Sequence, residues 1–243
     1  MTGIVAAVLD VLHRDGIDLE RLGLGWARVA PAVVLVPAFG LRALPRTAQA
    51  LMSLALAASL WPAVAPASRA SSAPWAFMAL SEIVRGLPVA VGAAVPLWAA
   101  TMAGGVADAV RGTQDLSPFP TVEGRTTPLG VPLSLIACAI FVYTGGPARV
   151  AEALTFAPMN DHPAQTVAAA LVSGITLAVA LAGPLLGGAV VVEVAAALVA
   201  RAASPAQIHA LLAPLRALAT LGILAIAFHR LADAIAQSQS GMW

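Results

Sequence analysis

Lysine is absent from this sequence, and charged residues of every kind are scarce. All thirteen basic residues are arginines, and charged types make up 10% of the 243 residues. The formal net charge is +1, and the arginines form no cluster. Because binding to nucleic-acid phosphates needs clustered basic residues, we expect no nucleic-acid partner. The single cysteine, Cys138, excludes an intramolecular disulfide.

Recognisable catalytic motifs are also missing. The sequence has no hydrolase elbow, P-loop, zinc-ligand spacing or dinucleotide fingerprint, and its glycines lie largely inside apolar segments. An intramembrane enzyme would need a nucleophile with a base, or two facing carboxylates, inside apolar helices. The histidines show no i, i+4 pairing with one another or with carboxylates in a metal-like cluster; they are His13, His162, His209 and His229. We therefore predict a protein that is not an enzyme, with no catalytic residue, cofactor or metal.

Long apolar stretches are what the sequence has in abundance. Hydrophobic types make up 60% of the chain and the mean hydropathy is +0.88, whereas soluble domains are roughly 45–50% apolar. Several uncharged runs reach the roughly 20 residues of a membrane-spanning helix; the runs are 29–41, 47–68, 86–107, 126–148, 162–192 and 217–229. The run 162–192 would form a helix about 46 Å long, more than a bilayer core of about 30 Å needs. A break at Gly183–Pro184 is therefore predicted.

This pattern predicts an all-α, membrane-type protein built of helical hairpins. We expect about six long apolar helices separated by Pro/Gly-rich breaks, in a single domain 1–243 that opens with an amphipathic segment at 1–20. The abundant alanine and glycine allow helix backbones to approach closely where lipid gives no hydrophobic drive. The predicted helices are 3–13, 21–41, 46–65, 75–110, 128–156, 164–202 and 205–238. Arginines are divided almost evenly between alternate loops, so the positive-inside rule indicates no topology.

Glu193 is the charged residue that stands out, because it lies in an otherwise apolar stretch. A carboxylate there needs a partner or a water-filled cavity, so it is a functional candidate. It is interpreted either as a substrate or proton site, or as a structural ion pair or partner contact. Arg201 lies two turns later, and an arginine of another helix is the alternative partner. Two other pairs at i, i+3 spacing are expected to mark helix ends; they are Glu82 with Arg85 and Asp108 with Arg111.

The segment 111–130 is the longest polar break, with three prolines and three glycines. Loops of this length inside a compact helical protein are uncommon unless they act as a lid, gate or binding element. The alternative is a disordered surface loop.

Four motifs in order resemble the FliR/SctT family, the flagellar and injectisome members of the type III secretion export apparatus. The first is "ARVAPAVVLVPAFGLRALPRTAQALMSLALAASLWP", which supplies Arg28, Pro37, Phe39, Gly40, Pro45 and Arg46. The second, "SEIVRGLPVAVGAAVPLWAATMAGGVADAVRG", supplies Glu82, Gly86, Gly92, Gly104, Asp108, Arg111 and Gly112. The third is an apolar helix that closes on Gly145 and Gly146. The last keeps Pro184, Glu193, Arg201, Pro214 and Arg216 in frame, while Pro205 and Gln207 lie one and two positions later than in the family pattern.

The resemblance implies a core component of a helical export gate, which would form part of the channel for unfolded export substrates. Its implied partners are the P/R and Q/S gate components, the U/B switch protein and membrane lipids. It implies the bacterial inner membrane as the location, with the assembled gate raised largely toward the periplasm. The polar break 111–127 would correspond to a plug-like loop; its residues include Arg111, Gly112, Asp115, Pro118, Phe119, Pro120, Gly124 and Arg125. The alternative function is a polytopic small-molecule permease that uses Glu193 as its substrate or proton site.

For the C-terminal region, 164–238, we predict a helical hairpin. Pro184 is expected to end or kink the first helix. A turn is expected at 203–205, with Ser204 as the N-cap of the second helix and Pro205 at its first position. Glu193 would then lie on the first arm, about two turns before the turn.

Overall fold

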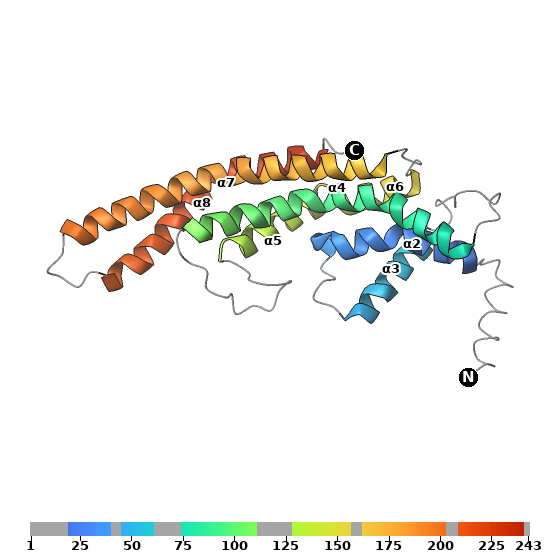
Figure 1. The fold of residues 1–243 in the computed structure, drawn as a ribbon. Helices are drawn as coiled ribbons and strands as arrows, with labels where there is room; N and C mark the ends of the chain where they lie inside the picture. The colour runs from blue at the N-terminus through green and yellow to red at the C-terminus, as the bar shows by residue number, and fades with distance from the viewer. Residues whose placement is uncertain are drawn as a thin grey trace. The chain divides into compact units, whose positions relative to one another are not determined.

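The computed structural model describes residues 19–39, 45–60, 74–110, 128–156, 162–202 and 209–240. These residues form helices and no strand, which confirms the all-α prediction. Figure 1 labels the α-helices, which are α2 (Leu19–Leu35), α3 (Arg46–Leu60), α4 (Trp75–Val110), α5 (Gly130–Tyr143), α6 (Gly146–Phe156), α7 (Pro163–Ala202) and α8 (His209–Ser240). A short 3-10 helix, η1 (Pro37–Phe39), follows α2. The predicted amphipathic segment and the predicted turn at 203–205 lie outside these residues.

The chain divides into two compact units. The first comprises Met1–Gly92 and Pro147–Ala168, and the second comprises Ala93–Gly146 and Ala169–Trp243. Helices α4 and α7 each contribute residues to both units. The single-domain interpretation stays a prediction.

In the first unit, α2 packs against α3 (Figure 1). The Trp26 indole donates a hydrogen bond of 2.7 Å to the Ser53 hydroxyl of α3. The buried residues of α2 are mostly small or branched apolar types, such as Ala27, Val29 and Ala32. Because these side chains are small or short, another helix can approach the α2 backbone closely. Helix α4 does so at Gly86, which lies against the Arg28 backbone carbonyl.

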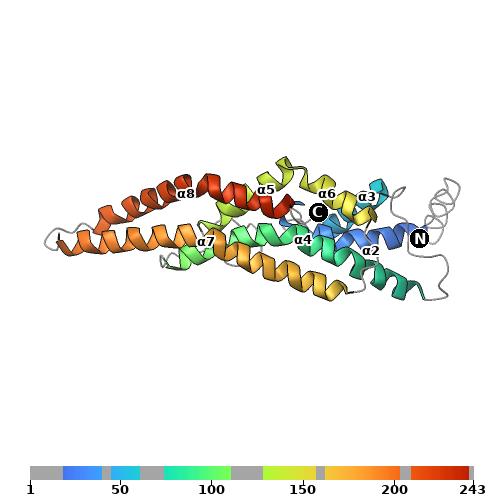
Figure 2. The same cartoon turned by 90° about the horizontal axis from the view of Figure 1, so that it is seen from above.

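In the second unit, α8 returns alongside α7, as both views show (Figures 1 and 2). A Cβ on Gly188 of α7 would lie 2.6 Å from Ile223 Cγ2 of α8, so the absence of a side chain sets the spacing between these helices. Helix α5 also packs against α8. The predicted hairpin is therefore present in the described residues of α7 and α8.

The expected break at Gly183–Pro184 is wrong. Helix α7 runs for 40 residues from Pro163 to Ala202 with Pro184 inside it. Pro31 of α2 and Pro214 of α8 are likewise accommodated inside helices. Proline removes one backbone hydrogen bond, but neighbouring helices and local adjustment offset this loss in apolar bundles, and the apolar sequence on both sides continues the helix.

The predicted helix 128–156 is divided into two. Helix α5 ends at Tyr143 and α6 begins at Gly146, so the chain breaks at Thr144–Gly145. Gly145 has φ of 76°, a left-handed conformation that glycine adopts without strain. The ring of Phe141 then packs over Gly146, where a Cβ would lie 2.5 Å from the ring. The resemblance anticipated an end at these glycines, whereas the helical periodicity did not.

Two described helices are long and apolar enough to cross a membrane, Trp75–Val110 and Pro163–Ala202. The number rises to four if each bent pair, α5 with α6 and the two halves of α8, is one span. At about 1.5 Å per residue, α4 and α7 are about 54 Å and 60 Å long, which exceeds a bilayer core of about 30 Å.

Candidate functional site

The strongest polar cluster in the first unit joins three elements that are far apart in sequence. Arg28 of α2 donates from Nε to Glu82 Oε2 of α4 at 2.6 Å, and from Nη1 to the Leu154 carbonyl of α6 at 3.3 Å. Both charged side chains are only 2% exposed. Buried charges are tolerated when they are paired and hydrogen-bonded, so this cluster holds α2, α4 and α6 together.

Arg85 completes the cluster. Its Nη1 lies 3.3 Å from Glu82 Oε1, and its side chain is 13% exposed. The expected pairing of Glu82 with Arg85 is therefore confirmed, but the shorter ion pair of Glu82 goes to Arg28, which the i, i+3 spacing did not reveal. Arg85 Nε is buried and has no hydrogen-bond partner in the described part of the chain.

Gly86 explains why α2 and α4 can approach so closely. A Cβ at this position would overlap the Arg28 backbone carbonyl oxygen. Because the obstacle is backbone, a side chain at Gly86 would force the helices apart. Three residues of the family motifs, Arg28, Glu82 and Gly86, thus meet at one crossing.

A second contact lies at the base of the polar break 111–127. Asp108 is fully buried at the end of α4, and its Oδ2 accepts a hydrogen bond of 2.6 Å from the Leu129 backbone N–H. One turn earlier, Gly104 packs directly on Gly130, where a Cβ would lie 2.6 Å from the Gly130 Cα. These contacts hold the residues on either side of the break together. The partner expected from spacing, Arg111, lies outside the described residues.

The third contact pairs the two arms of the C-terminal hairpin. Glu193 Oε2 of α7 lies 3.4 Å from Arg216 Nη2 of α8, and the side chains are 31% and 39% exposed. The sequence left two possible partners for Glu193, Arg201 of the same helix or an arginine of another helix, and the second is confirmed. Arg201 lies on the last turn of α7. The ion pair favours a structural role for Glu193 over a proton or substrate site.

The remaining predicted positions are placed as follows. Pro37 and Phe39 form the short helix η1, and Pro45 precedes α3. Gly92 lies inside α4. The positions outside the described residues are Gly40, Arg111, Gly112, Asp115, Pro118, Phe119, Pro120, Gly124, Arg125, Pro205 and Gln207.

Within the described residues no group of three or more His, Cys, Asp or Glu side chains is placed to hold a metal ion. His229 does, however, form an i, i+4 pair with Asp233, with Nε2 3.6 Å from Oδ2 on an exposed surface. The i, i+4 spacing of this pair is visible in the sequence, but two side chains alone do not make a metal-like cluster. An exposed pair of this kind has the geometry of an ordinary surface contact.

Comparison with known proteins decides the family. The sequence profile of "Bacterial export proteins, family 1" matches residues 19–242. The chain belongs to this family. The membership confirms the FliR/SctT resemblance, and with the apolar helices it identifies a membrane component of type III secretion export machinery.

A curated relative agrees over a shorter length. The chain is 36% identical over 73 residues to the secretion system apparatus protein SsaT of Salmonella typhimurium. The match covers 30% of this chain and 28% of that protein.

Sequence reasoning missed the functional contacts that involve backbone groups. The carbonyl of Leu154 and the N–H of Leu129 carry no signal in the sequence, because every residue has such groups. Ile223, which packs on Gly188, is an ordinary apolar residue of α8. A glycine inside an apolar helix was the available signal, since it marks a close backbone approach.

Proposed function

We propose that the chain is a core component of a type III secretion export gate, flagellar or injectisome, and forms part of the channel for unfolded substrates. The observation that carries this proposal is the family match over residues 19–242, within which the family-motif residues meet at helix crossings. Its partners would be the P/R and Q/S components and the U/B switch protein. The protein would act by gating and would have no enzymatic activity.

The length of α7 supports a location in which part of the protein lies outside the bilayer core, and by the FliR/SctT resemblance that part is raised from the inner membrane toward the periplasm. Large exposed apolar side chains extend along α7 from Leu171 to Val199, a distance of about 42 Å. Even at an average tilt of about 20°, the length of this apolar stretch along the membrane normal exceeds the bilayer core of about 30 Å. Partner subunits would cover the apolar surface that lipid does not reach.

The contacts at Asp108 support a plug role for 111–127. A loop that closes a pore needs a fixed base, so that its position is set by the protein around it. The hydrogen bond from Leu129 to Asp108 and the packing of Gly104 on Gly130 provide this base. An irregular backbone is tolerated at membrane depth where it is buried in protein or lines a cavity.

Deletion of 113–126 tests this role. Because the two ends are already held together, the residual connection can close without displacing α4 or α5. We expect the partner subunits to be recovered as with the wild type, while the bacterial membrane becomes permeable to ions and small molecules. A same-length scrambled segment controls for loss of chain length. An assembled deletion complex without added permeability would contradict the plug assignment.

A further inference from the structure

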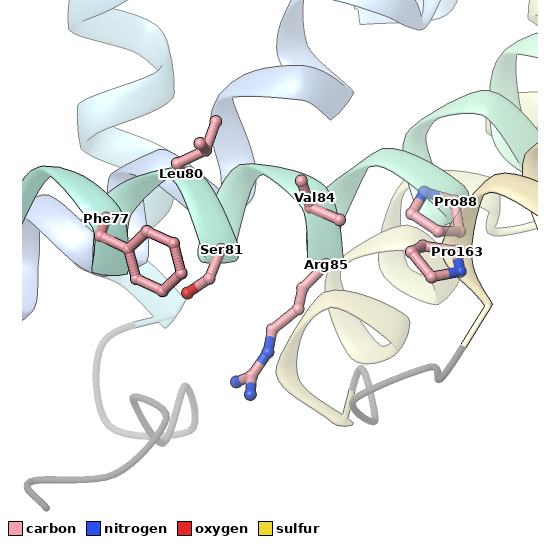
Figure 3. Close-up of a pocket in the computed structure, with 7 residues that line it drawn as sticks. All are labelled: Phe77, Leu80, Ser81, Val84, Arg85, Pro88 and Pro163. Atoms are coloured by element: carbon pink, nitrogen blue, oxygen red, sulfur yellow. The ribbon is translucent and has the colours of Figure 1, made fainter. Parts of the chain in front are cut away.

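A pocket of about 250 Å³ opens beside the buried ion-pair cluster of the first unit (Figure 3). Its walls are mostly apolar and come from α4 and from Pro163 at the start of α7; on α4 they include Phe77, Leu80, Val84 and Pro88. Two polar residues complete the lining, Ser81 and Arg85. Figure 3 shows both extending from the same side of α4.

Arg85 gives this apolar pocket a positive charge. The carboxylate that Arg85 contacts, Glu82, already makes its shorter ion pair with Arg28, at 2.6 Å against 3.3 Å. Glu82 thus contacts both the Arg28 and the Arg85 guanidinium groups. An anion beside Arg85 would be attracted by its guanidinium in an environment where electrostatic attraction is little screened by water.

The position of Arg85 along α4 suits a membrane surface. It immediately precedes the uncharged run 86–107, the most extended apolar part of this candidate span. An arginine at the end of an apolar run lies at the level where lipid headgroups begin. Trp75, an amphipathic ring typical of membrane interfaces, begins the same helix and is 47% exposed.

The lining of the pocket favours a flexible apolar chain that ends in an anionic group. Five of the seven lining residues are apolar, and the two polar ones, Ser81 and Arg85, lie on the same side of α4.

We propose that this pocket binds an anionic phospholipid. The lipid phosphate contacts the Arg85 guanidinium, and the first part of an acyl chain lies along Phe77, Val84 and Pro163. The site depends on the protein being in a membrane and not on its role as an export gate, so either conclusion can fail without the other.

The first test measures lipid selectivity in the full-length protein. Protein purified in a neutral detergent is incubated with phosphatidylglycerol or phosphatidylcholine, and bound lipid is counted by native mass spectrometry. We expect preferential retention of phosphatidylglycerol, and Arg85→Gln should reduce its affinity about fivefold to tenfold, the loss expected for one arginine at a lipid surface. Arg230→Gln, which removes one charge from exposed α8, is the matched control and should leave retention unchanged.

Further variants separate charge, shape and folding. Arg85→Lys keeps the charge and should retain most of the selectivity. Ser81→Phe fills the pocket and should remove lipid while leaving Arg85 in place. Inorganic phosphate should not displace the lipid, because it has no chain to occupy the apolar wall.

Several outcomes would overturn the proposal. These are equal retention of both lipids by the wild type, equal losses in Arg85→Gln and Arg230→Gln, or full displacement by inorganic phosphate. A Ser81→Phe variant that binds phosphatidylglycerol normally but no longer copurifies with its partner subunits would show that a partner side chain occupies the pocket instead.

Discussion

Within the described residues, two glutamate–arginine pairs join different helices, and they differ mainly in burial. Glu82 and Arg28 are each 2% exposed and lie 2.6 Å apart, with a backbone carbonyl as a third partner. Glu193 and Arg216 are 31% and 39% exposed and lie 3.4 Å apart. Both pairs connect family-motif positions on different helices.

The difference indicates two roles for the same chemistry. A fully buried pair cannot be broken without leaving an uncompensated charge in an apolar interior, so it fixes how helices cross. A half-exposed pair costs little to break, because water or another protein can replace the lost partner. The first pair is therefore suited to holding one subunit together, and the second to a surface that partners recognise.

The largest effect is expected from Arg28→Ala. It removes the shorter ion pair of Glu82 and the donor to the Leu154 carbonyl. Removal of one partner of a buried ion pair costs about 3–5 kcal/mol. The free energy of unfolding of the detergent-solubilised protein, measured with denaturant, should fall by this amount.

The matched control replaces both charges. Arg28→Met combined with Glu82→Leu removes both fully buried charges, and such replacements are often close to neutral. Arg85 loses its contact with Glu82, but its side chain is 13% exposed and lies nearer to water. The double variant should therefore recover most of the lost stability. If Arg28→Ala cost less than about 1 kcal/mol, the crossing would not depend on this pair.

Gly86→Ala probes the same crossing through packing, with a smaller expected effect. The new Cβ overlaps the Arg28 carbonyl oxygen, so a backbone must move. Overpacking of this kind costs about 1–3 kcal/mol. The measurement is again the free energy of unfolding, compared between Gly86→Ala and the wild type.

Gly25→Ala is its control in the same unit. Nothing lies within 4 Å of the position that this Cβ would take. Alanine is the better helix former by about 1 kcal/mol, so this variant should be neutral or slightly stabilising. Equal destabilisation by the two variants would indicate that helix propensity matters here and the close approach does not.

The helices were largely predictable from local sequence, because apolar length and polar breaks are local properties. The predicted helix 75–110 coincides with α4, and 164–202 differs from α7 by one residue at its start. Prediction failed where a local signal was overridden. Pro184 indicated a break, yet the apolar sequence on both sides continues through it.

The contacts between helices were less predictable. Spacing along α4 suggested Arg85 as the partner of Glu82, but the closer partner, Arg28, lies 54 residues away. That pairing depends on how α2 crosses α4, and the crossing depends on Gly86 meeting a backbone carbonyl. Glu193 could be recognised as unusual from its apolar surroundings alone, whereas its partner Arg216 required the hairpin.

Glu193→Ala should have the smallest effect on stability and a distinct effect on assembly. A half-exposed ion pair contributes about 0–1 kcal/mol, so the free energy of unfolding should change little. Glu193 nevertheless lies on α7, whose large exposed side chains are mostly apolar. A fixed charge on such a surface gives a partner subunit a specific contact. We therefore expect lower recovery of the partner subunits in copurification.

The charge reversal Glu193→Arg with Arg216→Glu separates the two contributions. It keeps an ion pair between α7 and α8 but exchanges the charges that a partner subunit meets. If Glu193 acts through the hairpin alone, the double variant should restore normal copurification, and recognition by a partner would be contradicted. If partner recovery stays low while the unfolding free energy is normal, the individual charges are what the partner recognises. Unchanged assembly with lost export in Glu193→Ala would instead indicate that this carboxylate faces the pore.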